Sequence, residues 1–437
     1  MFMSGEVTMD KIVSLAKRRG FIYPGSEIYG GLSGTWDYGP LGVELKNNIK
    51  NLWWRMFVQD RDDMCGLDAA ILMNPKAWEA SGHVSGFSDP LVECKKCKRR
   101  FRADQVDDKC PECEGAFGEV RQFNMMFKTQ VGASEAESAV TYLRPETAGG
   151  IFVNFKNVID SFHPKLPFGI AQIGKAFRNE IAPRDFIFRS REFEQMEIEY
   201  FVRPDEWKGA FEEWRKSVHA FNEAVGIPAS AVHELEVADT DRAHYSKRTI
   251  DFEFDFPFGR KELYGLAYRT DFDLQAHSGA SGVPLKMVDA EGGEPITPHV
   301  IEPSFGVDRT ILAVLASAYT EDELGGEART YLKFNSAVAP IKAAVFPLLK
   351  NKPELVAKAR EVYTMLKKFV PQVMWDDNGN IGKRYRRQDE IGTPYCITID
   401  FDTLGEKPEL KDTVTVRDRD TGEQERVSID SLLSRIA

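Results

Sequence analysis

The chain has 437 residues, a net charge of -11 and 42% apolar residues, which suits a globular protein of two or three domains. No apolar run is long enough to span a bilayer, and the first residues, with Glu6 and Asp10, lack the apolar stretch of a signal peptide. We therefore expect a cytoplasmic protein with no membrane partner. The negative charge excludes a generally basic nucleic-acid coat but is compatible with a local basic groove.

The N-terminal part predicts two helices and a strand. Residues 9–19 read as a short basic helix stopped by Gly20. A second helix begins at Pro40 and carries an apolar stripe through residue 56. Residues 64–73 read as a strand closed by Asn74-Pro75.

Four of the six cysteines form one spaced cluster, Cys94, Cys97, Cys110 and Cys113. Two thiolate pairs at two-residue spacing can close a tetrahedron around zinc and leave no open position for catalysis. We expect a structural zinc ribbon in a reducing compartment, with unligated thiols as the alternative. A basic run within and beside the cluster is either a solvated face or a contact with RNA: Lys95, Lys96, Lys98, Arg99, Arg100 and Arg102.

Residues 170–201 predict two antiparallel strands joined by a polar loop that Pro183 begins. In the first segment, period two puts Arg178 and Glu180 on one face. In the return strand it puts Gln195, Glu197 and Glu199 on one face and the apolar Met196, Ile198 and Tyr200 on the other. The pair could be an exposed sheet face with cross-strand ion pairs, or a binding site built on a sheet.

The neighbouring segments extend this sheet. Residues 141–150 read as strand, turn and helix start. Residues 204–226 carry an apolar stripe typical of a core helix. Residues 250–258 and 261–268 alternate as a hairpin, and residues 300–304 form a strand that leads into a helix from Val307. An antiparallel sheet flanked by helices is therefore expected.

The last hundred residues have a different pattern. Strands at 338–346, 373–375, 395–399 and 413–416 alternate with helices at 353–369 and 382–390. This alternation predicts a separate α/β domain.

Three segments resemble the motifs of class II aminoacyl-tRNA synthetases. Residues 177–180, Phe-Arg-Asn-Glu, and residues 193–197, Phe-Glu-Gln-Met-Glu, resemble motif 2. Residues 302–309 resemble motif 3, and the helix, strand and proline of residues 40–75 resemble motif 1. The return strand and the Arg-Pro-Glu-Thr of residues 144–147 are similar to those of the bacterial, homodimeric glycyl-tRNA synthetases in particular.

The resemblance implies an α+β catalytic domain with an inserted zinc ribbon, followed by a C-terminal α/β anticodon-binding domain. The corresponding boundaries are 1–90 and 126–337 for the catalytic domain, 91–125 for the ribbon and 338–437 for the last domain. It also implies a homodimer that uses glycine, ATP with Mg²⁺, and tRNA(Gly). Lys383, Arg384, Arg386 and Arg387 would meet tRNA phosphates, with a solvated basic helix as the alternative.

Activation of an amino acid by ATP requires cancellation of the negative charge on the phosphates. Arginine suits this because its fork binds phosphate oxygens bidentately and stays charged. By resemblance, Arg178 contacts the α-phosphate and the substrate carboxylate, and Arg309 is the motif 3 arginine. The residues implied for ATP binding are Arg178, Asn179, Glu180, Phe188, Arg189, Ser190, Arg191, Glu192, Phe193, Glu262, Leu263, Gly306, Val307, Asp308 and Arg309. Among them, Phe193 would stack on adenine. Glu262 would contact Mg²⁺, with a satisfied strand carboxylate as the alternative.

Glycine offers no side chain, so an enzyme must select it by excluding a methyl group and by binding its ammonium. A small pocket lined by carboxylates meets this need, because filling a pocket distinguishes one methylene by only roughly 1–3 kcal/mol. By resemblance, Glu146, Glu197 and Glu302 surround the ammonium, and Ser304 forms a compact wall. The residues implied for glycine binding are Arg102, Glu146, Phe193, Glu194, Gln195, Met196, Glu197, Glu302, Pro303, Ser304, Phe305 and Gly306.

Two other functions remain open at this point. One is a class IIa synthetase for another small amino acid. The other is a synthetase-like, non-catalytic subunit that binds nucleic acid, which would be expected to lack the arginines that this chain has at 178 and 309.

Overall fold

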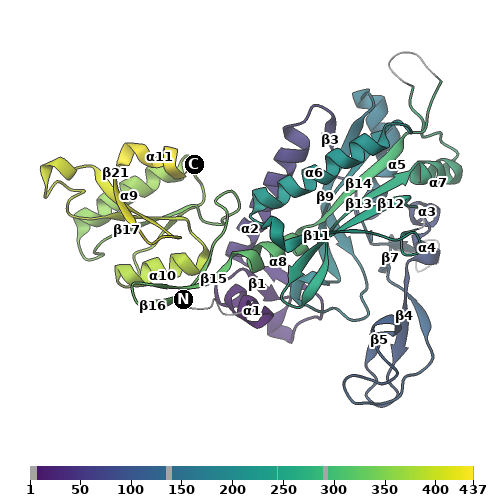
Figure 1. Cartoon of the computed structure of the whole chain (residues 1–437), viewed down its shortest axis with the longest axis horizontal. Helices are drawn as coiled ribbons and strands as arrows, with labels where there is room; N and C mark the ends of the chain where they lie inside the picture. Colours follow the sequence, from purple (N-terminus) through teal and green to yellow (C-terminus); the bar gives the residue numbers. More distant parts are fainter. Residues whose placement is uncertain (1–6, 134–139, 244, 289–293, 437) are drawn as a thin grey trace.

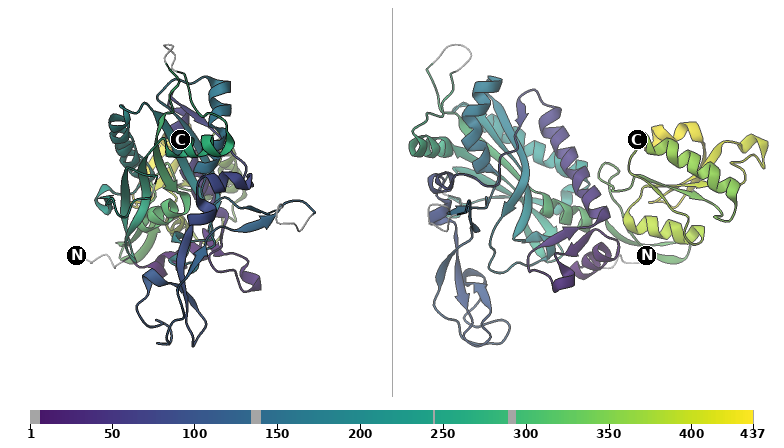
Figure 2. Two further views of the ribbon diagram at one scale, coloured as in Figure 1. Left: turned by 90° about the vertical axis from the view of Figure 1, so that its right-hand side faces the viewer. Right: turned by 180° about the vertical axis from the view of Figure 1, so that it is seen from behind.

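The computed structural model of the chain describes residues 7–133, 140–243, 245–288 and 294–436. Figure 1 shows a large body built around one twisted sheet, a smaller C-terminal domain beside it, and a narrow ribbon that projects from the large body. The right-hand view of Figure 2 shows that the ribbon and the C-terminal domain extend from separate parts of the large body.

The central sheet has seven strands in the order β11, β12, β13, β14, β10, β9, β3. Their bounds are Val232–Glu236, Arg248–Phe256, Gly259–Thr270, His299–Gly306, Glu192–Val202, Phe168–Phe177 and Met64–Gly66. Every neighbouring pair is antiparallel except β3 and β9. The predicted antiparallel sheet is confirmed, with one parallel edge strand.

The predicted strand at residues 64–73 is too long. Strand β3 has three residues, and the chain then leaves the sheet. The side chain of Arg144 donates from Nη1 to the carbonyl of Ala69 at 2.7 Å. A tertiary contact thus takes up a backbone group that strand pairing would otherwise use.

Helices cover both faces of the sheet. On one face lie α2 (Pro40–Trp54, continued by a π-helical turn at Arg55–Gln59), α6 (Trp207–Val225) and α8 (Val307–Ala318). On the other face α5 (Ala148–Phe162) and α7 (Phe272–Ser281) cover part of the sheet. The remainder of that second face is where polar side chains gather.

Strand β10 divides its side chains between the two faces, as predicted. Met196 and Ile198 are fully buried in the core with α2, α6 and α8. Glu197 and Glu199 point to the opposite face because successive side chains alternate. Arg178 and Glu180 were expected to share a strand face, but β9 ends at Phe177 and both residues lie in the following loop.

The ribbon is a three-stranded sheet in the order β5, β4, β6. Its strands are Arg100–Arg102, Ser88–Glu93 and Arg121–Asn124. The other elements of the large body are α1 (Met9–Arg18), β1 (Ile22–Pro24), β2 (Trp36–Tyr38), α3 (Pro75–Ala80), α4 (His83–Gly86), β7 (Lys128–Gln130), β8 (Val140–Tyr142), β15 (Tyr319–Leu324) and β16 (Glu327–Leu332).

The C-terminal domain has a five-stranded sheet in the order β18, β17, β19, β20, β21. The strands are Val373–Trp375, Ala343–Pro347, Tyr395–Ile399, Thr413–Asp418 and Gln424–Ser428, and the helices are α9 (Pro353–Lys367), α10 (Ile381–Ile391) and α11 (Leu432–Ile436). The first three strands are parallel, so the predicted α/β character is confirmed.

The first strand of this domain begins later than the predicted residue 338. The carbonyls of Val338 and Ala339 accept hydrogen bonds from Nδ2 of Asn48, at 3.3 and 3.0 Å, which ties this segment to α2. Among the residues that the structure describes, no helix combines the length and the apolar character needed to cross a membrane.

Candidate active site

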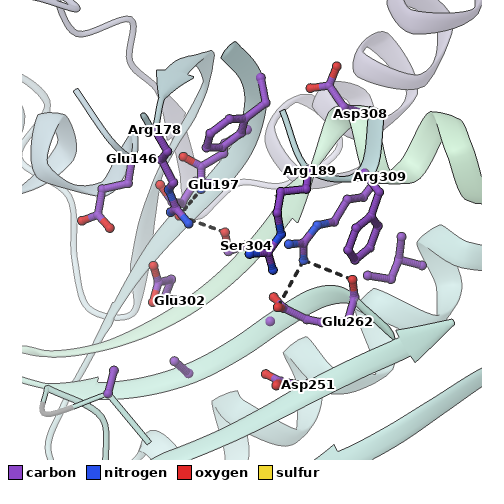
Figure 3. Close-up of a pocket in the computed structure, with 18 of the residues that line it drawn as sticks. Glu146, Arg178, Arg189, Glu197, Asp251, Glu262, Glu302, Ser304, Asp308 and Arg309 are labelled. Carbon is purple, nitrogen blue, oxygen red and sulfur yellow. Dashed lines mark hydrogen bonds and ion pairs between the residues drawn. The ribbon is translucent and has the colours of Figure 1, made fainter. Parts of the chain in front are cut away.

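A cavity of about 470 Å³ opens on the sheet face opposite α2, α6 and α8. The register places Gln195 of β10 beside Gly306 of β14, and Glu197 beside Ser304. Figure 3 shows two ends of this cavity. Glu146, Glu197 and Glu302 gather at one end near Arg178, and Arg189, Arg309 and Glu262 gather at the other.

Arg178 follows the last residue of β9 and lines the cavity. Its Nε donates to the carbonyl of Pro145 at 3.0 Å. Its guanidinium carbon lies 5.3 Å from the ring centroids of Phe87 and Phe193. The terminal nitrogens donate to none of the described residues, so a fixed cation faces the cavity with hydrogen-bonding capacity for an anion.

Arg309 lies in the first turn of α8 and lines the same cavity. Its Nη1 is 3.1 Å from Oε2 of Glu262, and its guanidinium carbon is 4.5 Å from the ring centroid of Phe188. Arg309 lowers the pKa of Glu262, against the effect of burial. The N-terminal turn of a helix adds partial positive charge, so this end of the cavity favours an anion.

The acidic end holds three buried or nearly buried carboxylates. Glu197 accepts from Oγ of Ser304 at 2.9 Å and from the hydroxyl of Thr147. Glu302 accepts from Nη1 of Arg269 at 2.9 Å. Nε2 of His83 lies 3.3 Å from Oε2 of Glu146.

The carboxylates at this end have shifted pKa values. Burial, and then the charge of Glu146, raises the pKa of Glu197. Burial raises the pKa of Glu302 to about 8, although Arg269 opposes this. Burial acts in the same direction on Glu146, but His83 outweighs it and lowers the pKa to about 2. Strongly shifted pKa values in one cavity are typical of functional sites.

Most of the residues expected from the sequence line this one cavity. They are Arg102, Glu146, Arg178, Glu180, Phe188, Arg189, Ser190, Phe193, Glu194, Gln195, Glu197, Glu262, Leu263, Glu302, Ser304, Gly306, Asp308 and Arg309. They come from the ribbon, the β8–α5 turn, the β9–β10 loop, three strands and α8. The fold therefore brings together segments that are far apart in the sequence.

Seven expected residues do not line the cavity: Asn179, Arg191, Glu192, Met196, Pro303, Phe305 and Val307. Met196, Phe305 and Val307 are fully buried in the core beneath the sheet, because they follow the apolar alternation. Arg191 donates to the carbonyls of Glu180 and Ser33, and thereby holds the β9–β10 loop against the loop before β2.

Two lining residues use their carboxylates to hold the site together. Asp308 accepts from the backbone N–H of Glu194 at 2.7 Å and from the hydroxyl of Tyr38. Glu194 lies 2.6 Å from Nζ of Lys46 and 2.7 Å from Nζ of Lys50, both on α2. These contacts join α2, β10 and α8, so the structure gives both acids a positioning role.

The ribbon reaches the cavity through Arg102, which pairs with Asp89 at 2.7 Å and Asp104 at 2.8 Å. In the same ribbon the Sγ atoms of Cys94, Cys97, Cys110 and Cys113 all lie within 4.8 Å of one another. Sulfur atoms bound tetrahedrally at about 2.3 Å from one zinc ion are about 3.8 Å apart. The four thiols are therefore compatible with a closed zinc site.

Family models match the catalytic domain and the C-terminal domain separately. Residues 127–318 match the family model described as the tRNA synthetase class II core domain (G, H, P, S and T). Residues 342–437 match the anticodon binding domain. The predicted class II core with a C-terminal anticodon-binding domain is confirmed.

Curated relatives match along the whole chain. A glycine–tRNA ligase of Clostridium tetani is 52% identical and covers 100% of this chain and 99% of its own. Glycine–tRNA ligases of Caldanaerobacter subterraneus subsp. tengcongensis and Bacillus thuringiensis subsp. konkukian are each 50% identical, over 98% and 97% of both chains. This chain belongs to the glycine–tRNA ligase family. The resemblance inferred from its motifs is thus confirmed.

Several site residues of this family member were not foreseen. Arg269 is 2% exposed and binds Asp273 through Nε and Nη2, both at 2.8 Å, in addition to Glu302. Its guanidinium carbon is 3.8 Å from the ring centroid of Tyr245. A single arginine at the end of an apolar strand gives no signal of burial, although the arginine–aspartate spacing of four residues could have suggested the ion pair.

Asp251 also lines the cavity, although the alternation of residues 250–258 predicts only that it belongs to a strand. Burial, and then Glu262 and Glu253, raises its pKa to about 7. The sequence patterns assigned no role to His83, because its contact with Glu146 depends on tertiary structure.

Class II enzymes use ATP with a divalent metal. The carboxylates of Glu262 and Asp251 line this end of the cavity and offer the hard oxygen atoms that Mg²⁺ prefers as ligands.

The basic helix of the C-terminal domain corrects one expectation. Arg384 is 1% exposed and donates to the carbonyls of Pro347, Asp377 and Gly379. The prediction that Arg384 meets phosphates is therefore wrong, because its guanidinium is buried and hydrogen-bonded to backbone carbonyls of its own domain. Arg386 pairs with Glu327 at 3.1 Å and Arg387 with Asp376 at 2.8 Å, so Lys383 is the residue of this group with the least internal pairing.

Proposed function

We propose that the protein activates glycine with ATP to form glycyl-adenylate and diphosphate, and then transfers the glycyl group to the terminal ribose of tRNA(Gly). The observation that carries this proposal is that one cavity has Arg178 beside clustered glutamates at one end and Arg309 at the other. Such a cavity accommodates a triphosphate and a small ammonium acid side by side. No protein base is needed for the first step, because the attacking carboxylate is already ionised.

For the nucleotide, Arg178 is proposed to contact the α-phosphate and the carboxylate of glycine, and Arg309 the terminal phosphate. Phe193 offers its ring to the adenine, with Glu180 near the exocyclic amine. Glu262, with Asp251 beside it, is the proposed contact for Mg²⁺. The fixed cations stabilise charge that develops in the transition state without reorganising at that moment.

For glycine, Glu197 and Glu302 are the proposed ammonium ligands, with Glu146 beside them. Ser304 holds Glu197 by a 2.9 Å hydrogen bond and limits the space near the α-carbon. Burial favours a cationic ligand, because an ammonium offsets the charge of the clustered carboxylates in a site with little water. Arg102 borders the same recess and is the proposed contact from the ribbon.

The remaining features are proposed by the same reasoning. Cys94, Cys97, Cys110 and Cys113 would hold a structural zinc ion in the ribbon at residues 91–125. The catalytic domain would comprise residues 1–90 and 126–337, and residues 338–437 would bind the anticodon arm. The protein would act in the cytoplasm as a homodimer that packs through α2 and the segment that follows it.

The test is ATP–diphosphate exchange with each amino acid in turn, followed by charging of tRNA. Stimulation by glycine alone is expected. Stimulation by only alanine or serine would assign the protein to another class IIa activity. No exchange with any amino acid, in a protein that still binds tRNA, would favour the non-catalytic function.

A further inference from the structure

Four side chains from four elements contact one another near the start of β10. They are Tyr38 of β2, Lys46 of α2, Glu194 of β10 and Asp308 of α8, and we call them the tyrosine–lysine network. Lys46, Glu194 and Asp308 are each 7% exposed. Charged side chains are rarely buried to this degree unless they are paired. Glu194 and Asp308 line the cavity, whereas Tyr38 and Lys46 lie outside its lining.

The contacts of the tyrosine–lysine network form a closed circuit. Nζ of Lys46 lies 2.6 Å from Oε2 of Glu194. The backbone N–H of Glu194 donates to Oδ2 of Asp308 at 2.7 Å, and the hydroxyl of Tyr38 donates to Oδ1 of Asp308. Nζ of Lys46 lies 4.4 Å from the centroid of the Tyr38 ring, which completes the circuit with a cation–π contact. Each residue is therefore held by two others.

Asp308 continues the pairing of β10 where β14 ends. Gly306 is the last residue of β14 and lies opposite Gln195, and the chain enters α8 at Val307. Strand β10 extends beyond this pair, and the carboxylate of Asp308 accepts the N–H of Glu194 in place of a strand carbonyl. The first turn of α8 is thereby tied to the start of β10.

The two network members that line the cavity stand next to residues proposed to bind ATP. Asp308 precedes Arg309, and Glu194 follows Phe193. Arg309 and Phe193 also line the cavity. Movement of the first turn of α8 against β10 would change the spacing between the proposed phosphate contact and the proposed adenine contact. A fixed spacing lowers the entropic cost of ordering the site when the nucleotide binds.

Lys46 supplies the charge that keeps the network together. Burial raises the pKa of Glu194, but Lys46 and then Lys50 outweigh it and lower the pKa below its ordinary value. Burial and then Asp308 raise the pKa of Tyr38 well above its ordinary value, so its hydroxyl stays protonated and remains a donor. Lys50 lies 2.7 Å from the second oxygen of Glu194, but its side chain is 24% exposed. Lys46 is therefore the buried cation of the network.

We propose that Tyr38 and Lys46 are positioning residues for ATP in the activation step. They act through Asp308 and Glu194, which carry the proposed ATP-binding residues beside them in the chain. The inference rests on the proposed function, and it extends the nucleotide site to β2 and α2, outside the cavity lining. Loss of either side chain should therefore weaken the binding of ATP without removing a ligand of the nucleotide or of glycine.

The first test is Tyr38→Phe, which removes one hydroxyl and leaves the aromatic ring beside Lys46. The KM for ATP in glycine-dependent ATP–diphosphate exchange should rise roughly tenfold, and the KM for glycine should stay within about twofold of the wild-type value. Tyr200→Phe is the matched control, because the hydroxyl of Tyr200 donates to Oδ2 of Asp63 at 2.7 Å from a position on β10 outside the cavity lining. It should keep both KM values.

A structural role and a positioning role predict different results. If Tyr38 only stabilised the fold, Tyr38→Phe would lower the free energy of unfolding, as Tyr200→Phe should, and would keep the wild-type KM for ATP. That result would overturn the proposal. An equal rise of the KM for ATP in both variants would also overturn it, because the effect would then not depend on the network.

The second test asks whether the contacts act as one unit. Lys46→Met should also raise the KM for ATP, and its combination with Tyr38→Phe should give less than the product of the two effects, because one opened contact already releases the network. Effects that multiply would contradict the proposal. If Lys46→Met does not fold, the comparison of Tyr38→Phe with Tyr200→Phe decides alone. Failure of the proposed function looks different, because the wild-type protein would then show no exchange with glycine at all.

Discussion

The two domains treat a buried acid in opposite ways. In the C-terminal domain, Asp389 is fully buried and its two oxygens accept from Nη1 and Nη2 of Arg417 at 2.7 and 3.0 Å. Arg329 approaches the same carboxylate at 3.4 Å. In the catalytic domain, Glu199 is equally buried and has no partner among the described residues.

The difference separates structural charge from functional charge. Asp389 is satisfied within the protein, so its ion pairs fix the packing of α10 against β20 and β16 and need no ligand. In the catalytic domain Arg269 bonds to Glu302 and Asp273, and none of the described residues bonds to the carboxylate of Glu199.

The largest expected effect is on the cationic side of the site. Arg309→Ala and Arg178→Ala should each lower the rate of glycine-dependent ATP–diphosphate exchange roughly 10³-fold, since each removes a charge that stabilises the phosphates in the transition state. Arg260→Ala, at the exposed start of β13, is the control and should retain the rate. Near-normal exchange in either active-site variant would remove that arginine from the mechanism.

The next effect concerns stability and should be confined to the other domain. Asp389→Ala leaves Arg417 and Arg329 buried without their shared partner, so the free energy of unfolding should fall by about 3–5 kcal/mol. Urea unfolding measures this. Below the unfolding transition, the exchange rate per folded molecule should not change. A loss of exchange in the folded variant would show that the ion pairs of Asp389 also affect the catalytic domain.

Glu197→Gln tests the acidic end. It removes one charged hydrogen-bond acceptor from the ammonium, so the KM for glycine should rise about 10- to 100-fold. The variant should fold with at least wild-type stability, because it relieves repulsion among buried acids. If it instead lost stability and kept its KM, Glu197 would be a structural acid like Asp389.

A pH-dependent prediction concerns Asp251. Its pKa is raised to about 7 by burial and nearby acids, so between the ordinary pKa of an aspartate and pH 7 the folded state binds more protons than the unfolded state. Stability is therefore lost as the pH rises through this window. Asp251→Asn should be more stable than the wild type at pH 8 and equally stable near pH 3.5, by urea unfolding at both pH values. An equal difference at the two pH values would exclude an ionisation effect.

The smallest effect is expected at the ribbon. Arg99 and Arg100 are 61% and 64% exposed at the side chain and pair with Glu112 and Glu93 on the surface. Replacing both with glutamate should raise the KM for tRNA severalfold in aminoacylation and leave the exchange reaction unchanged, because phosphate contacts act locally. No change in the KM for tRNA would identify the run as a solvated face.

Sequence patterns predicted elements best where one period dominates. The alternation in residues 250–258 and the apolar stripe of residues 204–226 correspond to β12 and α6. Patterns failed where tertiary contacts decide the backbone, as at Ala69 and at residues 338–342. Local patterns also could not predict the burial of Arg384, because its three carbonyl partners belong to Pro347, Asp377 and Gly379.

The motifs predicted residues that the fold brings to one cavity, but they did not predict the contacts around those residues. Arg178, Glu197, Glu302 and Arg309 stand in recognisable segments, and all four line the cavity. Arg269 and His83 act through contacts between elements that no local pattern specifies. Glu199 was placed on the correct face of β10 by its period, but the absence of a partner for it among the described residues is visible only in three dimensions.

The most direct test of the central claim is the structure of the protein with glycine and a non-hydrolysable ATP analogue. The amino nitrogen is expected to lie within hydrogen-bond distance of Glu197 and Glu302, with Arg178 on the α-phosphate side. An amino group directed away from both glutamates, or a triphosphate bound outside the cavity that Arg178 and Arg309 line, would contradict it.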